Sequence, residues 1–260
     1  MPELNIGIGL RSLRQSFKKA LHTAASVGAN GVEIDARNLL QPKDVSDTGR
    51  RQLRKLLDDL NLRIVSIRFP THRGYDVLAD LERRIDATKE AMRFAYALGA
   101  NVVVNAVGYV PEDPLHPAYL QLQESLGDLA RFGQHIGTLF ACETGSEPVE
   151  RLTALLDSIP DETIGVAFNP GNLIVNDFYD EESIERCAAK TLIVNARDGV
   201  RDLARGRGLE VPLGRGSADF PRILGVLEER RYRGWYILDR VTASEPAEEL
   251  GNAAQFLKAL

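Results

Sequence analysis

The chain has 260 residues, of which 44% are hydrophobic and 27% are charged, and its net charge is −5. These values provide for a large core and exclude a disordered chain, and the acidic balance disfavours a protein that mainly neutralises nucleic-acid phosphates. Two distant cysteines, Cys142 and Cys187, exclude a disulfide scaffold and a cysteine-rich zinc site. The sequence contains no apolar run of about 18 residues and no leader pattern at its start, so we expect a soluble, cytoplasmic protein.

Short apolar runs alternate with helical patterns along the first half of the chain. Ser12 and Gln15 have the spacing of a capping box before the first helix, and Gly28 stands where its C-terminal cap belongs. Pro70 ends the third run, because proline cannot donate to a strand ladder. The patterns predict strands at 4–10, 31–35, 62–69 and 102–106, and helices at 13–27, 46–60, 76–98 and 118–136.

The second half continues the alternation. It predicts strands at 138–143, 164–169, 191–196 and 235–240, and helices at 149–158, 181–188, 219–231 and 247–260. Strands separated by helices pair in parallel through crossover connections. Eight such strand–helix units are the number that forms a closed barrel. An open doubly wound sheet would more often carry a glycine-rich dinucleotide fingerprint, and none follows the first strand. We therefore predict a single (β/α)8 TIM barrel domain over residues 1–260.

Polar residues end several of these apolar strands. In a barrel the C-terminal strand ends carry the function, and a polar side chain there is unfavourable unless it is satisfied or used. Asn169 lies 26 residues after Glu143, and Asn195 lies 26 residues after Asn169, so one unit of the barrel separates each pair. The candidates at strand ends are Glu33, Asp35, Arg68, His72, Arg73, Asn105, Glu143, Asn169, Asn195 and Asp239. Cys142 alternates with Glu143 and is expected to face the helix layer as buried filler.

Six short segments occur in a characteristic order. They are GVEI at 31–34, LGA at 98–100, ACE at 141–143, NPGN at 169–172, NARD at 195–198 and LGRG at 213–216. Through them, nearly the whole chain resembles the xylose isomerase-like TIM barrel family of sugar phosphate isomerases and epimerases. In that family a divalent metal is typically held by Glu, Asp, His and Glu at the ends of strands five to eight.

The resemblance assigns the metal positions to Glu143, Asn169, Asn195 and Asp239. Glu143 keeps the expected residue type, Asp239 is one methylene shorter than the expected Glu, and two positions have become neutral amides. Uncharged amides bind a cation more weakly, so the metal is weakly held or absent, and Mg²⁺ or Mn²⁺ is favoured over Zn²⁺. The alternative is a hydrogen-bonded polar cluster without metal.

The same resemblance places Glu143 and Asp239 at the acid and base positions. Two carboxylates on opposite sides of a sugar can move a proton at a carbon next to a carbonyl, and without a metal an arginine could stabilise the enediolate. Five arginines follow the seventh strand, at positions 197, 201, 205, 207 and 215, and could meet a phosphate there. The alternative is a solvated loop in which Asp198, Asp202 and Glu210 pair with them. The predicted substrate-binding set is Glu33, His72, Asn105, Asn172, Arg197 and Arg201.

The sequence therefore favours a carbohydrate isomerase or epimerase that acts on a small sugar, polyol or sugar phosphate by proton transfer between Glu143 and Asp239. The alternative is a non-catalytic sugar- or anion-binding descendant that has lost the metal. A metal-dependent endonuclease of the same fold is disfavoured by the four histidines and the negative charge. We expect a small-molecule carbohydrate partner, phosphorylated or not, with no nucleic acid and no membrane, and homo-oligomer formation stays open.

Overall fold

The computed structural model describes residues 4–160, 163–202 and 207–260. Its principal strands are β1 (Ile6–Gly9), β2 (Gly31–Asp35), β3 (Arg63–Arg68), β4 (Val102–Asn105), β5 (Leu139–Glu143), β6 (Ile164–Phe168), β7 (Thr191–Ala196) and β10 (Trp235–Leu238). They pair in parallel and close into a barrel in the order β1-β10-β7-β6-β5-β4-β3-β2. The alternation in the sequence thus correctly predicts the (β/α)8 barrel.

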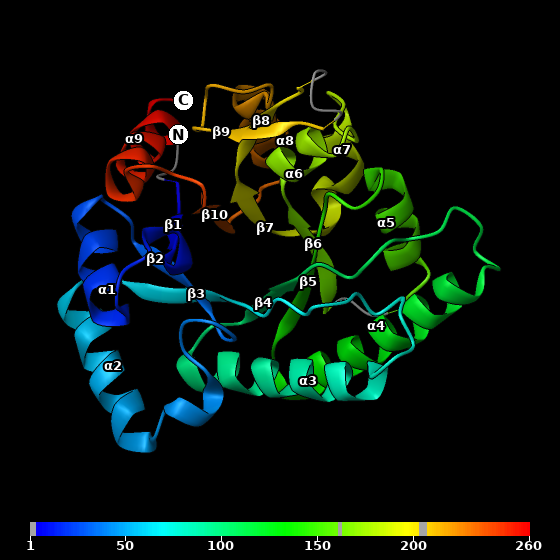
Figure 1. The fold of residues 1–260 in the computed structure, drawn as a ribbon, viewed down its shortest axis with the longest axis horizontal. Helices are drawn as coiled ribbons and strands as arrows, with labels where there is room; N and C mark the ends of the chain where they lie inside the picture. The colour runs from blue at the N-terminus through cyan, green and yellow to red at the C-terminus, as the bar shows by residue number, and fades with distance from the viewer. Residues whose placement is uncertain (1–3, 161–162, 203–206) are drawn as a thin grey trace.

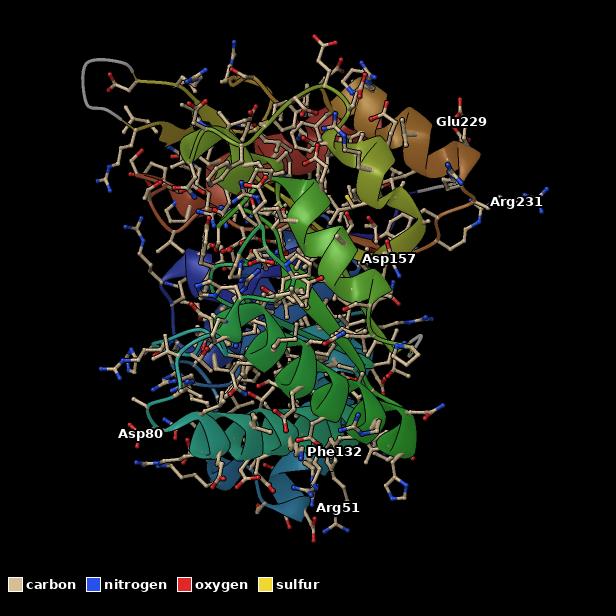
Figure 2. The ribbon with its side chains drawn as sticks, turned by 90° about the vertical axis from the view of Figure 1, so that its right-hand side faces the viewer. Arg51, Asp80, Phe132, Asp157, Glu229 and Arg231 are labelled. Carbon is tan, nitrogen blue, oxygen red and sulfur yellow. The ribbon has the colours of Figure 1, made fainter. Side chains whose placement is uncertain are left out.

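Helices surround the barrel (Figure 1). They are α1 (Phe17–Ser26), α2 (Asp47–Asp59), α3 (Leu81–Leu98), α4 (Pro117–Ile136), α5 (Val149–Asp157), α6 (Pro170–Val175), α7 (Ser183–Cys187), α8 (Phe220–Glu229) and α9 (Pro246–Ala259). Figure 2 shows charged side chains such as Arg51, Asp157 and Glu229 on the outside of these helices. Within the described ranges, no helix is both long and apolar enough to cross a membrane.

Local chemistry explains where several helices begin and end. The Ser46 side chain accepts a hydrogen bond of 3.2 Å from the backbone N–H of Gly49 at the start of α2. Pro117 and Pro246 open α4 and α9, where a missing N–H leaves no helical bond unmade. Gly28 has a φ of +84° after α1, which confirms the predicted glycine cap.

The core has two parts that follow the alternation of side chains along each strand. One apolar cluster belongs to the strands alone and consists of Val65, Val102, Val104, Ala141, Ala167, Ile193 and Ile237. A larger cluster joins the strands to the surrounding helices and contains Cys142, which is fully buried there as predicted. Because apolar residues fill the barrel in this way, polar residues that point inward are confined to the strand ends.

Several predicted boundaries are wrong. Helix α3 begins at Leu81 rather than at 76, and Leu78 is 72% exposed instead of packing on a helix face. Ser12 is not a helix cap, since it is buried in a 3-10 turn (Leu10–Leu13) and Ser16 precedes α1. Helix α6 and the antiparallel pair β8 (Asp198–Val200) and β9 (Leu209–Val211) were not predicted, because they are too short to show a periodicity.

Candidate functional site

Buried polar side chains meet at the C-terminal end of the barrel. All parallel strands end at this rim, so closure of the barrel brings together residues that are far apart in the sequence. Direct hydrogen bonds link most of these side chains to one another, and each is at most 7% exposed. The cluster, called the axial cluster below, consists of Glu33, Arg68, Glu143, Asn169, Asn195 and Asp239.

Arg68 lies between two carboxylates. Its Nη1 and Nη2 donate to Oε2 and Oε1 of Glu143 at 2.8 and 3.1 Å, which is a bidentate pair. Its Nε donates to Oε1 of Glu33 at 2.7 Å, and the Ser66 hydroxyl donates to the other oxygen of Glu33 at 3.0 Å. The ends of β2, β3 and β5 are therefore joined through one guanidinium group.

Two amides complete the surroundings of Glu143. Asn169 and Asn195 donate from Nδ2 to Oε1 of Glu143 at 2.9 and 2.7 Å. The Oδ1 of Asn169 accepts the backbone N–H of Asn172 at 2.9 Å and so caps α6. The Oδ1 of Asn195 is buried and has no hydrogen-bond partner among the described residues, which leaves one acceptor for a ligand.

Asp239 has its own set of donors in the 3-10 turn after β1. Arg11 donates to its two oxygens, with 3.3 Å from Nε to Oδ1 and 2.5 Å from Nη2 to Oδ2. The Ser12 hydroxyl donates to Oδ1, and its oxygen accepts the backbone N–H of Arg240 at 2.9 Å. The turn after β1 therefore holds the carboxylate that follows β10.

Glycine at the end of β1 makes room for Asp239. A Cβ at Gly9 would lie 3.1 Å from both Cβ and Oδ1 of Asp239, closer than most real Cβ contacts. A larger residue there would displace the carboxylate from Arg11 and Ser12.

Electrostatic interactions keep the acids of this site ionised. Burial opposes ionisation of Glu143, but the charge and hydrogen bonds of Arg68 outweigh it and hold the pKa of Glu143 below its usual value. Burial also opposes the charge on Asp239, yet Arg11 lowers the pKa of that carboxyl far below its usual range. The pKa of Arg68 is raised well above its usual value, because Glu143 and Glu33 overcome the effect of burial. The site is therefore a set of ion pairs at neutral pH.

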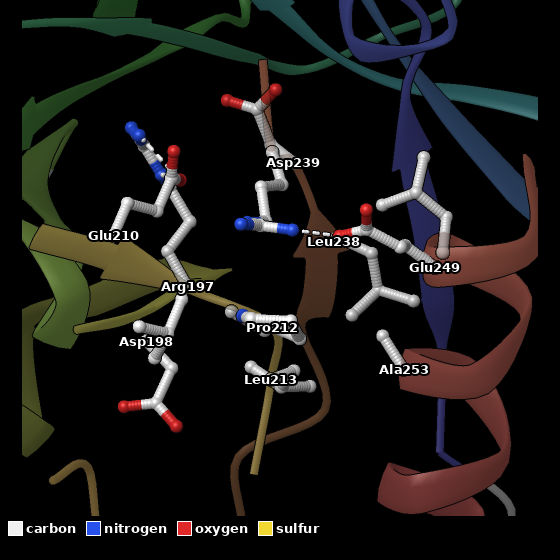
Figure 3. A pocket seen from close by; sticks show the side chains of 13 residues that line it. Arg197, Asp198, Glu210, Pro212, Leu213, Leu238, Asp239, Glu249 and Ala253 are labelled. Carbon is white, nitrogen blue, oxygen red and sulfur yellow. Dashed lines mark hydrogen bonds and ion pairs between the residues drawn. The ribbon is translucent and has the colours of Figure 1, made fainter. Parts of the chain in front are cut away.

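Arg197 lies at the side of the axial cluster. Its charge contributes to the lowered pKa of both Glu143 and Asp239, so it acts on both carboxylates. Its Nε donates to Oε1 of Glu210 at 2.6 Å, and the Thr242 hydroxyl donates to the other oxygen of Glu210 at 2.8 Å. Figure 3 shows Arg197, Glu210 and Asp239 around a cavity of about 20 Å³. That volume suits about one water molecule and no sugar.

The arginine-rich segment after β7 is only partly directed at the site. Arg201 is exposed and forms an ion pair with Asp177, while Arg207 and Arg215 are exposed. Arg205 lies outside the described residues. Arg197 pairs with Glu210, as the alternative of a loop with internal ion pairs predicted. Arg201 also forms an ion pair, but with Asp177, which was not among the expected acids.

Three other predicted substrate-binding residues lie apart from the axial cluster. The amide of Asn105 donates to Thr71 and Tyr75, both at 3.0 Å, rather than to a carboxylate of the cluster. His72 is exposed and lines an open hollow of about 860 Å³ between the loops after β2 and β3 and helix α3. Asn172 lies in the first turn of α6, where only its backbone N–H contacts the cluster. Of the predicted set, Glu33 is the residue that belongs to the cluster itself.

Three residues that shape the site have no functional role that the sequence alone revealed. Arg68 stood among the strand-end candidates, but its partner could not be identified without the barrel. Arg11 and Ser12 were overlooked because Ser12 was interpreted as a helix cap. Their position directly after β1, at the same rim as the other candidates, was the signal that could have revealed them.

The four positions that the resemblance assigns to a metal do not fit a divalent cation in this arrangement. Both oxygens of Glu143 and both of Asp239 already accept hydrogen bonds from arginine, amide or hydroxyl groups. Asn169 and Asn195 turn their N–H groups, not their oxygens, toward Glu143. Among the described residues, no three histidine, cysteine or acidic side chains are placed to share a metal ion. The carboxylates of this arrangement bind the guanidinium groups of Arg68 and Arg11 in place of a metal ion.

The fold and its polar rim define a (β/α)8-barrel protein with a candidate site at the C-terminal strand ends. The chain belongs to the xylose isomerase-like TIM barrel family, whose sequence pattern matches residues 21–260. A curated relative, inosose dehydratase of Clostridium beijerinckii, is 21% identical over 277 residues, which cover 94% of this chain and 89% of the relative.

Solved structures share the fold. A xylose isomerase domain protein from Planctomyces limnophilus has a TM-score of 0.87 and 22% identity, covering 99% of this chain and 97% of its own. A D-allulose 3-epimerase from Methylomonas sp., in complex with D-allulose, has a TM-score of 0.75 and 17% identity, covering 99% and 97%. A family protein from Mycobacterium smegmatis in complex with magnesium has a TM-score of 0.78 and 14% identity, covering 99% and 96%. At these identities the likeness shows the fold alone.

Proposed function

We propose that the protein is a carbohydrate isomerase or epimerase whose substrate is a small sugar, polyol or sugar phosphate bound at the axial cluster. The observation that carries the proposal is the pair of buried carboxylates, Glu143 and Asp239, on strands separated by β6 and β7 in the barrel. Both are held by arginines that reach the same rim. The relatives include an enzyme of a cyclic polyol and an epimerase of a ketose, which supports this class of substrate.

The proposed chemistry is proton transfer next to a carbonyl group. One carboxylate takes the proton from the carbon beside the carbonyl, and the electron pair moves onto the carbonyl oxygen to give an enediolate. Arg68 or Arg11 stabilises the negative oxygen of the enediolate, so this step needs no other positively charged group. In isomerisation, the same carboxylic acid returns this proton to the neighbouring carbon, while the hydroxyl proton on the deprotonated carbon passes to the former carbonyl oxygen. In epimerisation, the other carboxyl group takes a proton from solvent once the substrate has displaced its arginine, and it delivers this proton to the opposite face while the first group keeps the proton that it removed. Substrate oxygens compete for the arginine N–H groups and thereby free the carboxylates.

Solvent-proton exchange tests this proposal. The protein is incubated in deuterated water with D-fructose, D-allulose, an inosose and their phosphorylated counterparts, and deuterium at carbon is followed by NMR. We expect exchange with at least one substrate, and a loss of about 10²–10⁴-fold in Glu143→Gln and in Asp239→Asn. Glu229→Gln, an exposed carboxylate on α8, serves as the control and retains full exchange. Absence of exchange with the whole panel would contradict the proposal.

A second candidate is a sugar-binding protein without turnover. The observation that favours it is the lowered pKa of Glu143 and Asp239, whose ion pairs make both carboxylates weak bases. This candidate predicts that a sugar raises the melting temperature and no deuterium enters the sugar. Melting curves and the exchange experiment on the same panel distinguish the two candidates.

A further inference from the structure

We propose that the guanidinium group of Arg68 is the permanent cation of the axial cluster and that the site takes its ligand without a divalent metal. This inference concerns the charge at the centre of the site, and it holds for an enzyme and for a binding protein alike. It assigns to Arg68 the contact with the oxygen atoms of the ligand.

The space beside Glu143 is already filled. Arg68 nitrogens lie 2.8 and 3.1 Å from its two carboxylate oxygens. A divalent cation binds a carboxylate oxygen at about 2.0–2.2 Å. A cation bound between these oxygens would overlap with the guanidinium group. Arg68 and a metal therefore exclude each other at Glu143.

The balance of charge also opposes a metal ion. Arg68 is buried between Glu33 and Glu143, so both carboxylates already have a cationic partner. A dication would add a second cation next to the guanidinium group in a medium that screens charges poorly. The nearby amides of Asn169 and Asn195 present N–H groups, which repel a cation and stabilise Glu143 as an anion. These features favour one organic cation over a metal ion.

Arg68 and Asn195 keep hydrogen-bonding groups that no other residue in the described ranges uses. Three of the five N–H groups of Arg68 are used in the bonds to Glu33 and Glu143, and the described residues supply no further acceptor. Asn195 Oδ1 is a buried acceptor without a donor among the same residues. A ligand with a carbonyl or hydroxyl oxygen beside a hydroxyl group can accept from Arg68 and donate to Asn195. An α-hydroxy carbonyl compound or a vicinal diol has this pattern.

The first experiment uses the unmodified protein. After dialysis against a chelator, Mn²⁺ is titrated in the millimolar range, and bound ion is measured by electron paramagnetic resonance. We expect no stoichiometric binding, no change in melting temperature, and any sugar exchange to be the same with chelator as with Mn²⁺. One Mn²⁺ bound per chain with Arg68 intact would overturn the inference.

The second experiment removes the guanidinium group. In Arg68→Met, Glu33 and Glu143 lose their shared cation, so Mn²⁺ should bind and raise the melting temperature by about 5 °C when it is well above its dissociation constant. The control is Arg63→Met, which removes an exposed arginine from the other end of β3 and should not respond to Mn²⁺. An Arg68→Met protein that shows no response, or a control that responds equally, would contradict the inference.

The experiments test the role of Arg68 even if the Arg68→Met variant does not fold. If Arg68→Met is unfolded without metal, circular dichroism shows whether Mn²⁺ restores the fold, and the titration of the unmodified protein decides independently. Failure of the proposed isomerase is distinguishable, because absence of sugar exchange leaves both metal measurements unchanged. Exchange that requires Mn²⁺ would support the isomerase and overturn the role of Arg68.

Discussion

At the scale of single residues, the site depends on which carboxylates are paired. Glu143 and Asp239 are held by Arg68 and Arg11 and stay ionised. Glu147, four residues after Glu143, is also buried, and its carboxylate accepts a backbone hydrogen bond of 3.3 Å from Val110. Burial raises its pKa to about 7, with smaller lowering effects from Val110 and Arg151 and a small raising effect from Asp76. Glu147 therefore titrates near neutral pH.

Glu147 predicts a pH dependence of stability. Its folded pKa of about 7 lies above the ordinary value of 4.5, so the folded state holds the proton more tightly. The resulting stability is complete below the unfolded pKa and is lost as the pH rises through 7, by at most about 3 kcal/mol. Urea unfolding at pH 5 and pH 8 measures it, and Glu147→Gln should flatten the difference. An unchanged difference in Glu147→Gln would contradict this prediction, and Glu229→Gln is the exposed control.

At the scale of elements, a buried aspartate organises the segment after β7. Asp198 accepts the backbone N–H groups of Gly199 and Ala218 on Oδ1, at 2.8 and 3.0 Å. Its Oδ2 accepts those of Gly214 and Gly216, at 3.1 and 2.8 Å. The expectation that Asp198 pairs with arginines is wrong, because within the described residues its carboxylate accepts from backbone N–H groups instead. Its position beside the candidate site makes it a structural residue of the rim.

Asp198→Ala is expected to destabilise this segment. Four backbone N–H groups would lose their acceptor, and the free energy of unfolding should fall by about 3 kcal/mol. Urea unfolding measures the loss, and amide hydrogen exchange should accelerate at Gly214 and Gly216. Asp157→Ala, an exposed residue of α5, should change stability by less than about 1 kcal/mol. Equal effects of the two substitutions would show that the bonds of Asp198 contribute little.

Element boundaries could be predicted where the chemistry is local. The strand 31–35 and the strand 191–196 have the predicted bounds, because each is a short run containing β-branched residues between two helical patterns. The start of α3 was wrong, because Asp80 adopts a left-handed conformation (φ +56°) that no periodicity signals. Ser12 shows the same limit, since a serine that bonds Asp239 at the end of the adjacent strand β10 has the local pattern of a cap.

At the scale of the whole molecule, the apolar cluster inside the barrel supports the polar rim. Ile237 is fully buried in this cluster, and Asp239 follows it two residues later at the rim. Neighbouring strands share this interior, so a defect on one strand reaches the residues of the others. The stability of the barrel and the geometry of the site are therefore coupled.

Ile237→Ala tests this coupling. The substitution leaves a cavity in the barrel interior and should lower the free energy of unfolding by about 2–5 kcal/mol in urea denaturation. Val241→Ala is the control, because it removes methyl groups from a side chain that is 43% exposed. It should change stability by less than about 0.5 kcal/mol. A loss below about 1 kcal/mol in Ile237→Ala would indicate that the interior relaxes around the cavity.

The candidate site was predictable only in part, for a reason visible in Glu143. Its place at the end of a buried strand follows from the sequence, as do those of Asn169, Asn195 and Asp239. Their bonds do not, because Arg68 is 75 residues away from Glu143 and could equally extend into solvent at a strand end. A long flexible side chain has a defined direction only when its partner is placed beside it.

The sequence by itself determined the number of units, the parallel barrel and the rim on which the polar residues lie, because these follow from periodicity and from the unfavourable burial of unpaired polar groups. Only the tertiary structure decided that an arginine occupies the centre of that rim. The barrel brings the ends of β2, β3 and β5 to one rim, with only β4 between β3 and β5, and the buried charges of Arg68, Glu33 and Glu143 are stable only together.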